Sequence, residues 1–347
     1  MQPLYRPRPV LKSPRRTIDR RTPPEHAVRR LLSGEVIRLT DTYSTGADIL
    51  EELHAHLRPP RAAAGYPARR AFQRAYRDAA LRLLAPISGH QLALTGAESL
   101  GFLAELYPEH TGEFWLPLVE IQELYGAWRR YQDGTHLAVI GQRIHPFYGT
   151  YAPTRTSHLE LLATWLHRYQ GARDRAVDVG CGSGVIALML ARAGFSDVLA
   201  TDINPNAVES LRREIARRPE PPPITTRCCD LLTGVDPADL IVFNPPWMRG
   251  AIESPLDRAL YFEDGLFRRF FDQVIPTLSP GGRIVMVFSS VLSLVQPDVP
   301  HPIESELSRE RLKLVEKLTR RVKPPPDEHG RRRRTRERVE IWELVRA

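Results

Sequence analysis

Two groups of residues in this sequence have the types and spacing of a ligand site, and the first is a glycine-rich turn. Gly180, Gly182 and Gly184 follow Asp178 at the end of a short β-branched run, and an apolar stretch begins at Val185. Alternating glycines let the backbone turn tightly and let a ligand approach the main chain, while a helix beginning after them offers free N–H groups. The pattern therefore predicts a strand, a nucleotide-binding turn and a helix.

An acidic residue follows the next predicted strand. Asp202 comes directly after the predicted strand 197–201, so it reaches the same edge of a parallel sheet as the glycine turn. A carboxylate there can accept both hydrogen bonds of a ribose diol. A dinucleotide fingerprint would need glycine at position 185, where this chain has Val. The spacing therefore disfavours an NAD-dependent oxidoreductase.

The second group is Asn244-Pro245-Pro246-Trp247, which follows a predicted buried strand at 240–243. An exocyclic amine or side-chain amide is a poor nucleophile because its lone pair is delocalised. If the Asn244 side-chain oxygen and the Pro245 carbonyl each accept one N–H, the nitrogen can pyramidalise and direct its lone pair at a methyl donor. The prolines fix that carbonyl, and the aromatic ring can stack on the flat target.

Together these motifs resemble those of class I S-adenosylmethionine-dependent methyltransferases, and the second is similar to the N-P-P-aromatic motif of members that methylate planar nitrogen. The family usually has Tyr or Phe where this chain has Trp247. The resemblance implies a Rossmann-like, seven-stranded methyltransferase sheet, S-adenosylmethionine as cofactor and no metal. It also implies cofactor-binding residues: Asp178, Gly180, Gly182 and Gly184 around the methionine part, Asp202 on the ribose, Ile203 and Asp230 at the adenine, and Leu231 and Asn244 beside them.

Composition restricts the class of protein. The 347 residues, 42% of them hydrophobic, suggest two globular domains, and the net charge of +8 favours an acidic partner, nucleic acid first. The three cysteines lack metal-ligand spacing, which argues for a reducing compartment and against zinc. No apolar run reaches the roughly 18 residues of a membrane span, and no secretory signal is evident. We expect a cytoplasmic protein without membrane association, compatible with a monomer.

The pattern of breaks divides the chain into four segments. We expect a flexible basic arm at 1–23, which either contacts phosphates or remains a solvated tail. A mainly helical substrate-recognition domain should follow at 24–135, then a connector hairpin and helix at 136–170, and the methyltransferase domain at 171–347. Within the second segment, helices are predicted at 24–32, 47–57, 68–84, 98–106 and 114–131.

The last part of the chain should complete the sheet. A helix is predicted at 266–278, a buried strand at 283–288, and two final strands at 312–322 and 338–344 that pair as an antiparallel hairpin. The connection between the last two contains Arg331–Arg334. Such a block is either a solvated loop or a contact to phosphate.

The connector carries two histidines and a second resemblance. His145 and His158 flank Pro153–Thr156, a cluster similar to the segment that covers the cofactor in release-factor glutamine methyltransferases. Isolated histidines are more often structural than catalytic, and both are interpreted so.

Three functions remain open. The first is methylation of an exocyclic amine of a nucleic-acid base, in RNA before DNA, and the basic composition favours it. The second is protein glutamine N-methylation, favoured by the similarity around Pro153–Thr156. The third is a non-catalytic nucleic-acid-binding module that keeps the fold, which the intact Asp202 and Asn244 disfavour.

Overall fold

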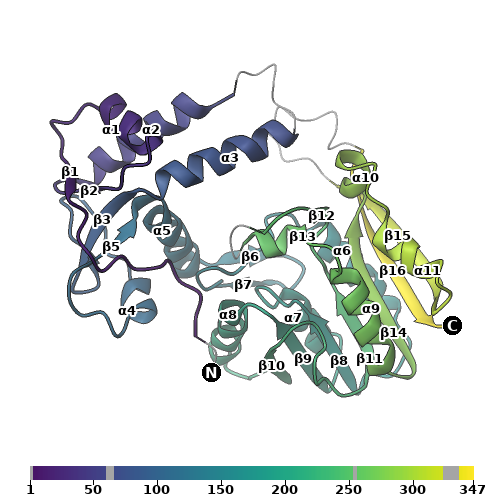
Figure 1. Cartoon of the computed structure of the whole chain (residues 1–347). Coiled ribbons are helices and arrows are strands. Elements are labelled where there is room, and N and C mark those ends of the chain that lie inside the picture. The colour runs from purple at the N-terminus through teal and green to yellow at the C-terminus, as the bar shows by residue number, and fades with distance from the viewer. Residues whose placement is uncertain (1–2, 60–65, 253–255, 323–335) are drawn as a thin grey trace. The chain divides into compact units, whose positions relative to one another are not determined.

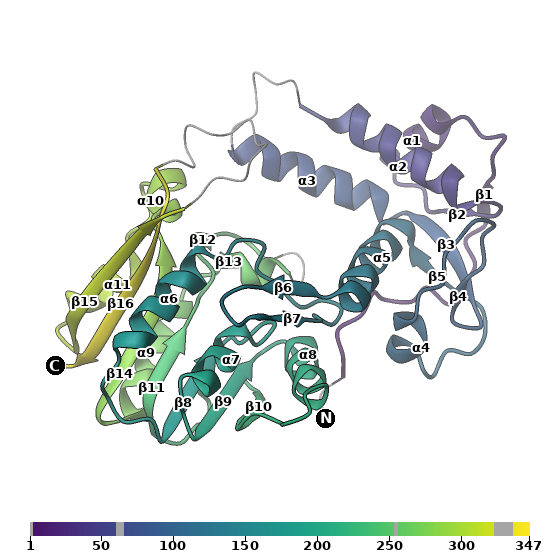
Figure 2. The same cartoon turned by 180° about the vertical axis from the view of Figure 1, so that it is seen from behind.

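The computed structural model describes four stretches of the chain: residues 3–59, 66–252, 256–322 and 336–347. Internal contacts divide the chain into two compact units, a smaller one of Arg6–Arg129 and a larger one of Arg130–Ala347 that also includes the first five residues. Figure 1 and Figure 2 show the elements of both units from opposite sides.

A seven-stranded sheet forms the centre of the larger unit. Its strand order is β10-β9-β8-β11-β14-β16-β15. The first five strands are parallel, and β16 runs antiparallel to both of its neighbours. This topology confirms the predicted Rossmann-like sheet and its closing hairpin. The strands are β8 (Arg175–Val179), β9 (Asp197–Asp202), β10 (Ile224–Cys228), β11 (Ala238–Phe243), β14 (Leu278–Ser289), β15 (Leu312–Arg321) and β16 (Arg338–Arg346).

Helices cover both faces of this sheet, so successive residues of each central strand enter different cores. On β14, Val285 joins the core beneath α6, α7 and α8, while Met286 joins the core beneath α9. Burial on both faces explains why these strands are continuous apolar runs. Among the described helices, none combines the length and apolar character needed to cross a membrane. The covering helices are α6 (Ser157–Arg168), α7 (Val185–Arg192), α8 (Pro205–Ala216), α9 (Leu266–Thr277), α10 (Val291–Val295) and α11 (Pro302–Leu307).

The connector contains the predicted hairpin. Strands β6 (Thr135–Leu137) and β7 (Gln142–Ile144) pair antiparallel, and Gly141 adopts a φ of +59° in the turn between them. The Arg block predicted to lie between the last two strands, Arg331–Arg334, falls outside the described residues.

The smaller unit contains a sheet as well as helices, which the sequence analysis did not predict. Residues 83–87 are all buried in β3, and residues 114–117, predicted as the start of a helix, form β5 instead. Short apolar runs do not distinguish a buried strand from a buried helix. The strands are β1 (Arg16–Ile18), β2 (Ile37–Leu39), β3 (Leu83–Ser88), β4 (Gln91–Leu92) and β5 (Phe114–Pro117).

Within the described residues, five α-helices accompany that sheet, each at or near a predicted position. The first matches its predicted bounds, because Pro24 is favoured at a helix start, and the fourth is shorter than predicted. The boundary between the two contact units falls inside the fifth. They are α1 (Pro24–Leu32), α2 (Tyr43–Leu57), α3 (Tyr66–Ala80), α4 (Phe102–Leu106) and α5 (Leu118–Asp133).

The segment expected to be a flexible arm differs from that expectation where it is described. The main chain of Val10 exchanges two hydrogen bonds of 2.9 Å with Trp115, and the Tyr107 hydroxyl donates to the Pro7 carbonyl at 2.7 Å. Further on, Ile18 is 2% exposed within β1. These are main-chain contacts that require no side-chain periodicity, so the composition of the segment does not reveal them.

Candidate active site

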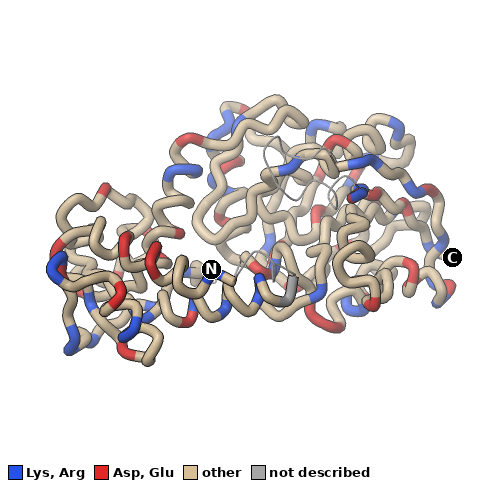
Figure 3. The backbone as a smooth tube through the Cα atoms, turned by 90° about the horizontal axis from the view of Figure 1, so that it is seen from above, with Lys and Arg blue, Asp and Glu red and all other residues tan. Residues whose placement is uncertain are grey.

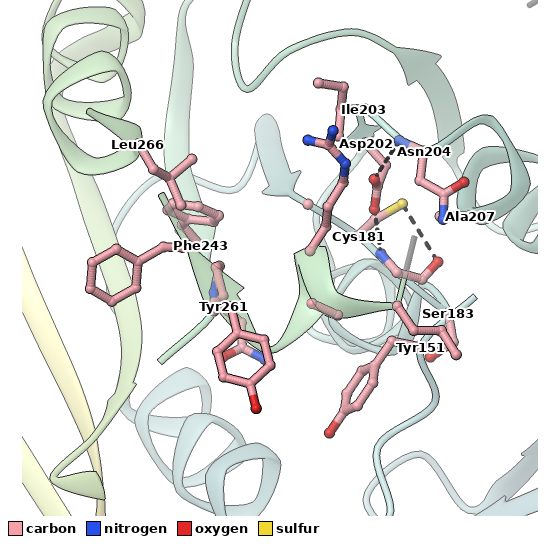
Figure 4. Close-up of a pocket in the computed structure, with 18 of the residues that line it drawn as sticks. Tyr151, Cys181, Ser183, Asp202, Ile203, Asn204, Ala207, Phe243, Tyr261 and Leu266 are labelled. Carbon is pink, nitrogen blue, oxygen red and sulfur yellow. Dashed lines mark hydrogen bonds between the residues drawn. The ribbon is translucent and has the colours of Figure 1, made fainter. Parts of the chain in front are cut away.

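A pocket opens at the carboxyl ends of the central parallel strands. The strand order reverses between β8 and β11, which is where ligands bind in open α/β sheets. Its cavity volume is about 210 Å³, and its lining includes Asp202 after β9, Asp230 after β10 and Asn244 after β11. Figure 4 shows Cys181, Asp202 and other side chains that line it. The structure thus brings both sequence motifs into one site.

The glycine turn after β8 requires its glycines. Gly180, Gly182 and Gly184 have φ values of +66°, +51° and +78°, a region that disfavours side chains with a Cβ. Two main-chain N–H groups of the turn are bound by β9, since that of Cys181 donates to the Thr201 carbonyl and that of Gly182 to the Asp202 carboxylate, both at 2.9 Å. The turn is therefore anchored to β9.

Gly184 supports a test of this turn. Besides the positive φ, a Cβ at this position would lie 2.4 Å from Cδ1 of Leu211, which is fully buried and has little room to move. We expect Gly184→Ala to lower the free energy of unfolding by roughly 2–5 kcal/mol, from backbone strain and overpacking together. Urea denaturation measures the change.

Gly281 provides the matched control for that substitution. Its φ is +75°, but a Cβ there would meet nothing within 4 Å. Gly281→Ala should therefore cost only the strain, about 1–2 kcal/mol. Equal losses in the two variants would show that the packing against Leu211 does not matter.

Asp178 supports the turn from behind. It is 1% exposed, is not among the residues that line the pocket, and accepts a hydrogen bond of 2.9 Å from the Ala187 main chain in the first turn of α7. Burial raises the pKa of Asp178 to about 7, although this hydrogen bond opposes the shift. The side chain thus satisfies a free N–H at the helix start. Its predicted place beside the methionine part of a cofactor becomes, in the structure, a supporting one.

Asp202 combines a structural role with an exposed acceptor surface. One carboxylate oxygen accepts from the Gly182 main chain at 2.9 Å and the other from the Asn204 main chain at 2.8 Å. Each oxygen keeps a further lone pair, and the residue lines the pocket. Burial raises the pKa of Asp202, while these main-chain hydrogen bonds favour its charged form. The geometry fits a group that also accepts from a ligand diol.

The predicted cofactor residues Ile203, Asp230 and Leu231 also line the pocket. Ile203 is 47% exposed and offers an apolar surface, although most isoleucines of this unit are buried. Leu231 has a φ of +52°, a costly value for a branched side chain. Asp230 lies 3.3 Å from the guanidinium of Arg269, so one partner for its carboxylate already exists.

Asn244 presents an unpaired acceptor. Its side-chain oxygen is buried, and no group in the described part of the chain donates to it. A buried acceptor without a partner costs about 1–3 kcal/mol, so such an atom in a pocket indicates that a ligand supplies the donor. Pro246 also lines the pocket, whereas Pro245 is buried and does not line it.

Trp247 does not occupy the predicted place. Its indole N–H donates to the Val287 carbonyl at 3.3 Å, and its ring meets the His158 ring edge-on at 5.5 Å. The ring packs against both cores and is not among the residues lining the pocket. A partly buried indole needs an acceptor, and β14 supplies it. The prediction that Trp247 stacks on the target is therefore corrected.

Some residues that line the pocket had no predicted ligand role: the sequence analysis did not single out Tyr151 or Tyr261, and it interpreted His158 as structural. His158, Tyr151 and Tyr261 all line the pocket, and Figure 4 shows both tyrosines there. Burial raises the pKa of Tyr151. Tyr261 begins β13 (Tyr261–Phe262), which pairs with β12 (Met248–Arg249). Strands of two residues carry no periodic signal, so only the fold could reveal this side chain.

His158 is 5% exposed and neutral, because burial lowers its pKa to about 4. The unfolded chain binds the proton more strongly, with a pKa near 6.5, so the free energy of unfolding should fall as the pH drops from 6.5 toward 4. Between pH 7 and 4.5 the loss due to His158 should be about 2–3 kcal/mol. Chemical denaturation at both pH values measures it.

The control for this prediction is His158→Gln, which cannot titrate. Asp178, whose pKa is raised, contributes the opposite slope, because its stabilisation is present at low pH and lost as the pH rises through about 7. The quantity to compare is therefore the difference in the free energy of unfolding between wild type and variant at each pH. If the free energy of unfolding of wild type and variant changes in parallel with pH, folding does not lower the pKa of His158.

Comparison with known families identifies this part of the chain. Residues 157–297 match the family model described as methyltransferase small domain. The larger unit contains a class I methyltransferase small domain. The match extends from the start of α6 to just beyond α10, so it includes the glycine turn, Asp202 and Asn244. The resemblance drawn from the two sequence motifs is thereby confirmed.

Two curated relatives match parts of the chain. A ribosomal protein L11 methyltransferase of Thermotoga neapolitana is 35% identical over 106 residues, which are 30% of this chain and 35% of the relative. A tRNA1(Val) (adenine(37)-N6)-methyltransferase of Aeromonas salmonicida (strain A449) is 34% identical over 131 residues, 34% of this chain and 53% of the relative. The chain thus spans about a third to a half of the length of these relatives.

A solved structure, of ribosomal protein L11 methylase from Lactobacillus delbrueckii subsp. bulgaricus, is similar at 18% identity. It covers 56% of this chain and 88% of its own, with a TM-score of 0.39. A superposition of this quality is too loose to assign function. The fold assignment therefore depends on the strand order and directions of the sheet itself.

Proposed function

We propose that the protein is an S-adenosylmethionine-dependent N-methyltransferase acting on a planar nitrogen, specifically an exocyclic amine of an RNA base. The observation that carries the proposal is the buried, unpaired side-chain oxygen of Asn244 at the end of β11. It lies in the same pocket as the glycine turn and Asp202. An unpaired hydrogen-bond acceptor in a cofactor pocket fits a substrate that donates N–H groups to it.

The pocket residues fit the cofactor. Asp202 has free lone pairs for a ribose diol, Ile203 exposes an apolar surface for adenine, and the glycine turn admits close approach to the main chain. When bound, S-adenosylmethionine supplies a methyl group that the sulfonium already activates. The chain must then position the acceptor nitrogen and exclude water.

Asn244 and Pro245 are assigned the positioning of that nitrogen. The Asn244 side-chain oxygen and the Pro245 carbonyl accept its two N–H groups, which favours a pyramidal nitrogen with an available lone pair. Both acceptors also stabilise the positive charge that develops on the nitrogen. Neutral His158 lines the pocket nearby and adds no competing charge.

RNA is favoured over protein by the net charge of +8. The relative named as a tRNA adenine-N6-methyltransferase supports this choice. A protein glutamine amide is the second candidate, because of the similarity around Pro153–Thr156. A relative named as a ribosomal protein L11 methyltransferase supports a protein substrate. Basic and acidic residues are interspersed in both units (Figure 3), so charge alone does not decide.

Label transfer tests the proposal. The protein is incubated with radiolabelled S-adenosylmethionine and separately with total RNA, DNA and protein from cells that lack it. We expect label in RNA. Label in protein alone would replace the base by a protein nitrogen, and no label in any pool from an active cofactor-binding preparation would support the non-catalytic alternative.

A further inference from the structure

One wall of the pocket is formed by the segment that follows Trp247. We call its described residues, 248–252 and 256–262, the acceptor wall. The Met248 main chain donates to the Leu260 carbonyl at 3.3 Å, and that of Gly250 donates to the Phe262 carbonyl at 3.1 Å. These hydrogen bonds hold the two ends of the wall together. The wall contributes apolar, aromatic and cationic side chains to the pocket: Ile252, Leu256, Arg258, Ala259, Tyr261 and Phe262.

Tyr261 is the flat ring of the acceptor wall. Because Trp247 is turned into the core, the aromatic surface expected from the sequence motif must come from another residue. The Tyr261 ring lies against Gly250, where an added Cβ would be 2.9 Å from Cδ1 of the ring. Figure 4 shows this ring among the lining side chains, on the same side of the pocket as Tyr151. The ring is therefore both accessible and fixed.

Arg258 is the residue of the acceptor wall that offers a guanidinium for a ligand. It lines the pocket from the short helix η2 (Asp257–Ala259), and within the described residues it forms no ion pair or hydrogen bond. Arg269, which also lines the pocket, lies 3.3 Å from Asp230, and Arg249 pairs with Asp264 at 2.6 Å. A planar guanidinium without a carboxylate partner can bind a phosphate through two hydrogen bonds.

Acidic residues that line the pocket would repel a phosphate, so a phosphate needs a specific cationic partner there. Glu263 also lines the pocket, as do the predicted cofactor residues Asp202 and Asp230. An anion would not be held there by a general positive field. It would need the specific fork of donors that Arg258 offers.

We propose that Arg258 and Tyr261 form the nucleotide-recognition part of the acceptor site. Tyr261 stacks on the base whose exocyclic amine Asn244 holds, and Arg258 binds a phosphate attached to that nucleotide. The inference rests on the proposed N-methyltransferase function and narrows its substrate to a nucleotide within a polynucleotide. A glutamine side chain has neither an aromatic face nor an anionic group for these two residues.

Binding of mononucleotides tests the phosphate contact. With the cofactor site saturated by S-adenosylhomocysteine, calorimetry compares adenosine, guanosine and cytidine with their 5′- and 3′-monophosphates. For at least one base, the wild type should bind a monophosphate about tenfold more tightly than the nucleoside, as expected for one charge-assisted contact. Arg258→Gln should abolish that difference. The same preference in the variant, or no binding to the wild type at about millimolar concentration, would overturn the proposal.

Arg268→Gln is the matched control. Arg268 is also exposed and lies 3.8 Å from Asp272 on α9, but it does not line the pocket. This variant should keep the preference for the monophosphate. Loss of the preference in both variants would indicate a general charge effect and would contradict a contact specific to Arg258.

Methyl transfer to RNA tests the stacking contact. Tyr261→Ala should raise the KM for RNA by roughly 5- to 150-fold, the range of base stacking on an aromatic side chain, while Tyr261→Phe should retain it. Affinity for S-adenosylhomocysteine should be unchanged in both and serves as the measure of folding. If RNA is labelled but these variants behave as wild type, only this inference fails. If label enters protein alone, the proposed function fails with it.

Discussion

Replacing Asn244 by Ala is expected to lower the rate of methyl transfer at saturating substrates by about a hundredfold to a thousandfold, the range for loss of one preorganised group in a reaction centre. No group in the described chain donates to the side-chain oxygen, and Asn244 lines the pocket, so the oxygen has an unused lone pair for the acceptor nitrogen. Affinity for the cofactor should change little, because the ribose and adenine positions are assigned to other residues. Single-turnover label transfer with the identified substrate measures the rate.

Asn244→Asp serves as the comparison for that variant. It keeps an acceptor oxygen in place, so it should retain more activity than the Ala variant, although the added charge sits in a buried position. Unfolding curves and affinity for S-adenosylhomocysteine establish that both variants are folded. A rate within a few-fold of wild type for Asn244→Ala would remove the side-chain oxygen from the mechanism.

The sheet of the larger unit could be predicted from sequence because its strands carry strong local signals. β9 and β11 lie within two residues of the predicted ranges 197–201 and 240–243, and β8 is the β-branched run predicted before the glycine turn. β8 is followed by a glycine, β9 ends at an aspartate and β11 is followed by an asparagine. The sheet of the smaller unit could not. Its β2 has only three residues, and β5 continues directly into the helical pattern of α5. Tertiary pairing with β3 determines both.

The candidate site shows the same division. Residues at strand ends could be predicted, because parallel strands deliver Asp202 and Asn244 to one edge whatever the surrounding loops do. The direction of a side chain depends on its partners. The Trp247 indole donates to the Val287 carbonyl, and the Asp178 carboxylate accepts from the Ala187 main chain. The Tyr261 ring packs against a glycine eleven residues earlier in the chain. None of these partners lies close enough in sequence to produce a recognisable pattern.

Asp202→Ala is expected to weaken cofactor binding by at least about 1.5–3 kcal/mol, or roughly 10- to 150-fold, which corresponds to one lost hydrogen bond to a charged acceptor. The loss should be larger if both oxygens bind the ribose. The same carboxylate accepts from the main chains of Gly182 and Asn204, so its removal also frees the glycine turn. Calorimetry with S-adenosylhomocysteine measures the affinity.

Two measurements separate the lost ligand contact from the loosened turn. Asp202→Asn keeps one acceptor oxygen but loses the charge, so its affinity should lie between those of wild type and the Ala variant. Comparison of S-adenosylhomocysteine with its 2′,3′-dideoxyribose analogue then isolates the diol. Wild type should discriminate strongly between the two, whereas Asp202→Ala should not, because it has no carboxylate for the diol to meet. If the Ala variant still prefers the diol to the same extent, Asp202 acts only by holding Gly182 and Asn204, and the ribose contact belongs to another group.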